Sequence, residues 1–199
     1  MARMWNLSAV LGLAVALVAA GGDVASNETA ELRGARQTHA DRQPPDWFVT
    51  EVRRLVNDGD AWITDNAPYM SDDEPWAEYG MVWQRAQDGN GATGRLSGLV
   101  DGEERATFWE MRLSWDEERQ EARMWQRSGD GTVGEGTMKA TGHGIETESI
   151  QTFTEPDGTT SEVRHLATTT EDTHVTRSFH RVADEWQPRR EYVWKKRPR

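Results

Sequence analysis

The side chains best suited to chemistry are five histidines in a chain of 199 residues. His165 and His180 fall in segments expected to form neighbouring strands. A two-residue turn at Glu171-Asp172 would make them diagonal neighbours, about 7–8 Å apart between backbones. Neutral imidazoles there could bind haem or a metal ion, although hydrogen-bonded histidines in a half-polar cavity fit as well. No His-x-x-x-His pair or carboxylate triad accompanies them, so we expect no cofactor and no metal, with haem at His165 or His180 as the alternative.

The sequence holds no recognisable catalytic constellation. It has no cysteine, which excludes a thiolate nucleophile, disulfides and cysteine-ligated zinc. It also lacks a Gly-x-Ser-x-Gly elbow and a carboxylate pair fixed by a motif. A strand histidine acting as a general base would leave no motif. An isomerase, lyase or hydrolase that uses His165 or His180 is therefore the enzymatic alternative to a binding protein.

The elements that position these side chains are expected to be strands. From residue 79 onward, turn-forming clusters rich in Gly, Asp and Asn recur at intervals of about 12 to 16 residues. Eight such turns predict about nine sequentially joined strands. An up-and-down antiparallel sheet of that size most simply closes into a barrel. The turns are Asp88–Gly91, Asp101-Gly102, Asp116–Glu118, Gly129–Gly131, Gly142–Gly144, Pro156–Gly158, Glu171-Asp172 and Ala183–Glu185.

One helix is expected before the barrel. Apolar residues recur at helical spacing through Phe48, Val52 and Leu55, after Asp46, which we expect to cap the helix. Asn57-Asp58-Gly59 provides the stop. We interpret residues 61–78 as a connector.

Pairing the strands across these turns predicts an interior with two walls. One wall is apolar and consists of Tyr79, Met81, Trp83, Leu96, Val100, Trp109, Met111, Leu113, Trp115, Trp125 and Met138. The later strands add a more polar wall of His165, His174, Thr176, Ser178, His180, Trp186, Arg190, Tyr192 and Trp194, with a bulge or an edge at Pro188. An apolar surface with a few converging polar groups is typical of a small-molecule pocket. We predict a small, largely apolar or amphipathic ligand, bound by Trp83, Trp109, Trp125, His165, His180, Arg190 and Tyr192.

Several of these segments resemble exported bacterial lipocalin-like (calycin) β-barrels. They are residues 79–83 (YGMVW), 94–98 (GRLSG), 107–110 (TFWE) and 129–134 (GDGTVG), and the resemblance covers roughly residues 46–199. The short Gly-x-Trp strand signature of true lipocalins is missing. The resemblance implies a binding barrel and carries over no catalytic residue.

The start of the chain predicts export. Residues 7–20 are an uninterrupted run of apolar or small residues behind Arg3. The run is too short for a membrane span, which takes ~20 residues, but suits the core of a signal peptide. We assign residues 1–22 to the signal peptide, with cleavage after Ala20 or within two residues of it. Residues 23–45 are assigned to a disordered polar tether and residues 46–199 to the helix and barrel. We expect the mature protein in the periplasm or outside the cell, without a transmembrane segment.

The charge balance restricts the partners. A net charge of −11 argues against binding to nucleic acid or an anionic membrane. The basic residues are 20 Arg and only 3 Lys, which suits a high-salt environment, but a GC-rich genome would also favour Arg codons. A basic C-terminus could bind an anionic partner or simply form the solvated end of the last strand. A packed envelope protein that binds partners on its surface and no ligand is a further alternative to a carrier.

Overall fold

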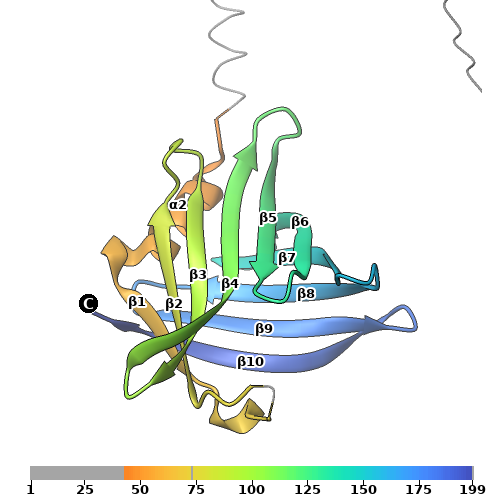
Figure 1. Cartoon of the computed structure of the whole chain (residues 1–199). Coiled ribbons are helices and arrows are strands. Elements are labelled where there is room, and N and C mark those ends of the chain that lie inside the picture. Colours follow the sequence, from red (N-terminus) through yellow and green to blue (C-terminus); the bar gives the residue numbers. More distant parts are fainter. Residues whose placement is uncertain (1–42, 73, 199) are drawn as a thin grey trace, which may run out of the picture. The chain divides into compact units, whose positions relative to one another are not determined.

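The barrel is closed and entirely antiparallel. The structure, a computed structural model, describes residues 43–72 and 74–198, so the predicted signal peptide (1–22) and most of the predicted tether (23–45) lie outside the described residues. Helix α2 precedes ten strands (Figure 1). The elements are α2 Asp46–Val56, η1 Asn57–Gly59, β1 Ala61–Asp65, η2 Ala67–Tyr69, β2 Glu78–Arg85, β3 Ala92–Val100, β4 Glu103–Asp116, β5 Glu121–Ser128, β6 Val133–Ala140, β7 Glu146–Thr154, β8 Thr160–Thr169, β9 Thr173–Val182 and β10 Glu185–Arg197.

The mainly β, up-and-down architecture predicted from the turns is confirmed, with ten strands instead of about nine. All eight predicted turns fall at the connections between consecutive strands from β2 to β10, although Asp116 and Glu185 themselves belong to β4 and β10. The missed strand is β1, which lies in the segment that we interpreted as a connector. It pairs with β10 on one side and with β2 on the other, and thereby closes the barrel. Its five residues are too few to show a clear alternating pattern.

Turn length decides which side chains point inward, because a shift of one residue moves a strand's side chains to the opposite face. The β4–β5 loop contains four residues, since Asp116 pairs with Glu121, and not the three that we predicted. Asp116 belongs to β4, and its carboxylate accepts hydrogen bonds from the backbone N–H groups of Glu118 and Arg119. The prediction that Trp125 points inward is therefore wrong: Met124 and Gln126 line the interior, and their neighbour Trp125 faces outward.

The β9–β10 hairpin also differs from the predicted register by one residue near its turn, and a bulge further along β10 restores the predicted inward-facing residues. Its turn is the two residues Ala183-Asp184, both with positive φ, so Trp186 faces outward, contrary to the prediction. A bulge between Pro188 and Arg190 then shifts the register by one residue. The bulge predicted at Pro188 is confirmed. Beyond it Arg190, Tyr192 and Trp194 return to the inner face.

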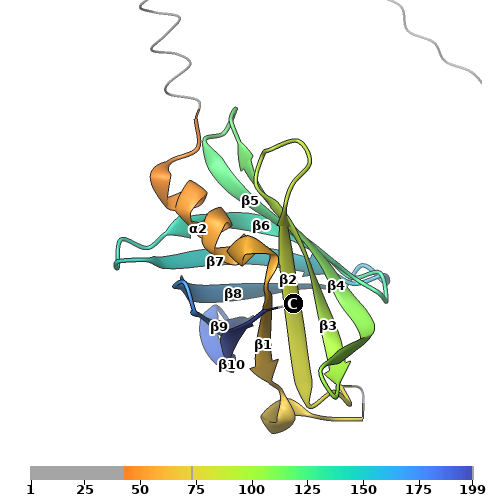
Figure 2. The same ribbon diagram turned by 90° about the vertical axis from the view of Figure 1, so that its left-hand side faces the viewer.

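Helix α2 crosses one end of the barrel (Figure 2) and contacts β2 and β8. Its N-cap position is Pro45 and not Asp46, which lies in the first turn; the predicted stop is confirmed by Asn57 in the left-handed conformation. Phe48, Val52 and Leu55 are buried against the barrel. The fully buried Trp62 of β1 donates from Nε1 to the carbonyl oxygen of Leu55 at 2.9 Å, which joins the helix to the barrel wall. This end of the barrel is closed. Within the described residues, no helix is long and apolar enough to cross a membrane.

Candidate functional site

The barrel interior contains two adjoining cavities. The inner one, about 190 Å³, reaches the closed end, where Glu51 and Leu55 of α2 line it. The outer one, about 620 Å³, extends toward the opposite end and is lined there by Trp76, Phe108 and Asp130. The cavities share six lining residues: Leu96, Gln126, His165, Ser178, Arg190 and Tyr192. The outer cavity alone is of the size of ordinary small-molecule pockets, roughly 300–1,000 Å³.

The wall of the inner cavity is apolar on the early strands and polar on the later ones, as the pattern of the sequence predicts. Its apolar side includes Met81, Trp83, Met111, Leu113, Met124 and Met138, and its polar side includes Thr147, Ser149, Gln151, Thr176 and Ser178. The methionine side chains are unbranched and adapt to ligands of different shape.

His165 lies where the two cavities meet. It pairs with Ser178 across β8 and β9, as predicted, and lines both cavities. Neither ring nitrogen has a hydrogen-bond partner among the described residues. Burial, together with the nearby charge of Arg189, lowers the pKa of His165 to about 4. At neutral pH the ring is therefore uncharged and offers one donor and one acceptor to the cavity.

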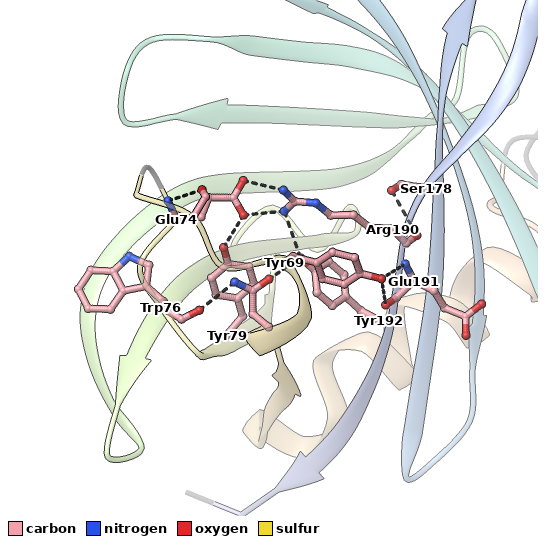
Figure 3. Close-up of polar contacts among 10 residues, drawn as sticks. Tyr69, Glu74, Trp76, Tyr79, Ser178, Arg190, Glu191 and Tyr192 are labelled. Carbon is pink, nitrogen blue, oxygen red and sulfur yellow. Dashed lines mark hydrogen bonds and ion pairs between the residues drawn. The ribbon is translucent and has the colours of Figure 1, made fainter.

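Arg190 and Tyr192 are held in a polar cluster of protein side chains (Figure 3). The Arg190 guanidinium donates two hydrogen bonds to Glu74, at 2.7 and 2.8 Å, and a third to the Tyr192 hydroxyl at 3.2 Å. The Tyr79 hydroxyl also donates to Glu74 at 3.0 Å. The pKa of Glu74 is lowered, chiefly by the hydrogen bonds from Arg190.

The Tyr192 hydroxyl in turn donates to Asn66 Oδ1 at 2.7 Å. Tyr69 completes the cluster, with Arg190 Cζ lying 5.3 Å from the centre of its ring. The charge of Arg190 is thus already matched by Glu74. The cluster also ties β10 to the segment between β1 and β2.

A second polar group lies at the closed end. The Thr169 hydroxyl of β8 lies 2.8 Å from Glu51 Oε1 and 2.8 Å from His174 Nδ1. All three side chains are buried, and Glu51 and His174 line the inner cavity. Burial raises the pKa of Glu51 to about 7, against the smaller opposing effects of the Thr169 hydrogen bond and the charge of Arg54. Burial also lowers the pKa of His174 to about 4.

Five of the seven predicted site residues line a cavity. Trp83 lines the inner one, Trp109 the outer one, and His165, Arg190 and Tyr192 line both. His180 is the predicted diagonal neighbour of His165 but lines neither cavity, and its buried Nδ1 has no partner in the described structure. Trp125 faces outward, as described above. Of these two misses, Trp125 results from the wrong β4–β5 register, whereas His180 has the predicted pairing but lies outside both cavities.

Glu51 and Glu74 are the most important residues that sequence reasoning missed. Glu51 carries a signal: it occupies a position of the apolar helix face, three residues after Phe48 and four before Leu55, where a charge is unexpected. Glu74 carries none, because its partner Arg190 lies 116 residues away in the sequence. We interpreted Glu74 only as part of the connector at residues 61–78.

Comparison with known proteins assigns no family, since no family model matches the chain and no curated protein matches it in sequence. Among the described residues, no three His, Cys, Asp or Glu side chains lie close enough together to hold a metal ion. The candidate site is therefore defined by the cavities and their lining alone.

Proposed function

We propose that the protein is a carrier that binds a small, largely apolar molecule in the barrel and meets its polar group with His165. The observation that supports this most is the free imidazole of His165 at the junction of the two cavities. A hydrogen bond formed inside such a cavity contributes about 0.5–1.5 kcal/mol. A ligand hydroxyl or carbonyl that bonds to this ring would gain that stabilisation.

The proposal includes a lipocalin-like role outside the cytoplasm. A closed antiparallel barrel with one helix across its end is compatible with a lipocalin-like binding protein. Together with the apolar run at residues 7–20, this leads us to propose an exported carrier in the periplasm or outside the cell.

The protonation state of His165 favours a role in ligand binding over a role as general base for this residue. A general base works best when its pKa lies near the working pH, whereas the pKa of His165 is about 4. Such a ring is a weak base at neutral pH but a good hydrogen-bond partner. We therefore place His165 in ligand recognition.

The proposal is tested by incubating the purified protein with lipid extracts and identifying bound molecules by mass spectrometry, with tryptophan quenching measured in parallel. We expect an apolar molecule with one or more polar groups. His165→Phe should weaken its binding about tenfold, through loss of a buried hydrogen bond.

Two tryptophan variants locate the bound molecule. Trp83→Phe should reduce the quenching because Trp83 lines the inner cavity, while Trp125→Phe should preserve it because Trp125 faces outward. Absence of any bound molecule, or quenching that depends on Trp125, would overturn the proposal.

A further inference from the structure

The closed end of the inner cavity has hydrogen-bonding capacity that the proposed function does not use. Glu51 accepts a hydrogen bond from Thr169 on Oε1, and its Oε2 has no partner among the described residues. His174 is engaged through Nδ1, and its Nε2 likewise has no partner in the described structure. Both residues line the cavity. A ligand that reaches the bottom of the barrel therefore meets two side chains that each keep one polar atom without a protein partner in the described part of the chain.

When Glu51 is ionised, the two hydrogen bonds of Thr169, to Glu51 and to His174, each have a defined donor and acceptor. A carboxylate only accepts, so the single hydroxyl proton of Thr169 is donated to Glu51. His174 Nδ1 must then carry a proton and donate it to the Thr169 oxygen. Because the ring is neutral, its Nε2 is left as a bare acceptor. The cavity floor thus presents two acceptors, and one of them belongs to a negatively charged group.

The negative charge has no counter-ion in the described structure. No Lys or Arg forms an ion pair with Glu51, although the charge of Arg54, one turn away on α2, acts on it. Burying a carboxylate without a cation is unfavourable. The floor therefore has the charge and the acceptors that suit a cation with several N–H donors.

We propose that this floor is a subsite for a protonated primary amine, so that the inner end of the ligand is an alkylammonium group. The inference rests on the proposed carrier function and names one end of its ligand. One N–H of the ammonium donates to the free oxygen of Glu51 and a second to His174 Nε2. An alcohol supplies one donor and no charge, and a carboxylate supplies no donor and is repelled by Glu51.

Three probes with the same alkyl chain separate these possibilities: octylamine, octanol and octanoate. Binding is measured by calorimetry and by tryptophan quenching at about pH 8, where the amine is still protonated and which lies above the Glu51 pKa of about 7. We expect octylamine to bind about tenfold more tightly than octanol, as charge-assisted hydrogen bonds in a buried site allow. Octanoate should bind weakest of the three.

Glu51→Gln tests the residue directly, because the amide oxygen still accepts from Thr169 while the charge is lost. This variant should bind octylamine about tenfold more weakly and octanol as before, which also shows that the cavity remains intact. Glu110→Gln, at an exposed position of β4, is the matched control and should leave all three affinities unchanged. Equal binding of amine and alcohol, or an unchanged amine affinity in Glu51→Gln, would overturn the amine subsite. Failure of all three probes to bind would instead contradict the carrier function.

Discussion

At the scale of single residues, the buried titratable groups make opposite contributions to stability as the pH changes. The folded state holds the Glu51 proton up to about pH 7, whereas an ordinary carboxyl releases it near 4.5. Between these values the folded state binds more protons than the unfolded one, so the Glu51 contribution falls as the pH rises. Two histidines that line the inner cavity, His165 and His174, have pKa values lowered from 6.5 to about 4. Their contribution is lost as the pH falls through this range.

Glu51→Gln should therefore become increasingly stabilising, relative to the native chain, as the pH rises. The charged residues that act on this position are Arg54 on the same helix and, through Thr169, His174 of β9, and neither changes charge between pH 5 and 8. We expect the difference in the free energy of unfolding to grow by about 2.5 kcal/mol over that range. Urea unfolding at the two pH values measures it. A difference that is the same at both pH values would show that Glu51 titrates normally.

His165→Leu should have the complementary effect in acid. The native chain loses stability between about pH 6.5 and pH 4, because the unfolded histidines take up protons that the buried rings do not. Removing one ring should reduce this acid loss by about 3 kcal/mol. Thermal unfolding at a series of pH values checks it, with His143→Leu, at an exposed turn, as control. An identical loss of stability in acid for both variants would show that the folded barrel does not lower the pKa of His165.

At the scale of elements, the sequence predicts strands well and registers poorly. Turn residues such as Asp101-Gly102 locate a hairpin because both residues adopt positive φ. The number of residues in a loop depends on which side chain caps it, as Asp116 does between β4 and β5. One extra residue in that loop moves the Trp125 side chain from the inner to the outer face of the barrel. Two bulges in β3–β4 change the partner of Leu96 from the predicted Thr107 to Trp109. Because this is a shift of two residues, and side chains alternate between the faces, Leu96 and Trp109 still face inward. Long-range partners such as Glu74 and Arg190 leave no local signal at all.

Glycine placement within the strands gives a test of the packing. A Cβ added to Gly94 would lie 2.7 Å from the indole of Trp83, which is buried. Gly129, in the β5–β6 loop, has open space around it. Gly94→Ala should therefore destabilise the barrel by about 1–3 kcal/mol, and Gly129→Ala should cost little. Denaturant unfolding of the two variants makes the comparison. Equal stability would mean that Trp83 does not pack over Gly94.

At the scale of the whole molecule, the net charge of −11 should make stability depend on salt. Repulsion within an acidic chain weakens as salt screens it, and screening shortens from about 10 Å at 0.1 M to about 3 Å at 1 M. If the Lys-poor composition is an adaptation to salt, the melting temperature should keep rising toward molar sodium chloride. Salt also weakens exposed ion pairs such as Arg95–Glu104, but these contribute little to stability, so they reduce the expected rise only slightly. A neutral domain of equal size is measured in parallel as the control. If the melting temperature stops rising near physiological ionic strength, the composition reflects codon usage.

The central claim is that the barrel interior is a binding site, and two adjacent residues of β8 test it most directly. Ala167 lines the inner cavity, whereas the next residue, Thr168, lies on the opposite face of the strand. Phenylalanine at position 167 fills the cavity, and phenylalanine at position 168 adds the same bulk outside the barrel.

The measurement is the affinity of each variant for phenylnaphthylamine, an uncharged apolar fluorescent probe. Binding to the native chain and to Thr168→Phe, with at least about tenfold weaker binding to Ala167→Phe, is the result that the structure predicts. Equal binding to both variants, or none to the native chain, would contradict an interior binding site.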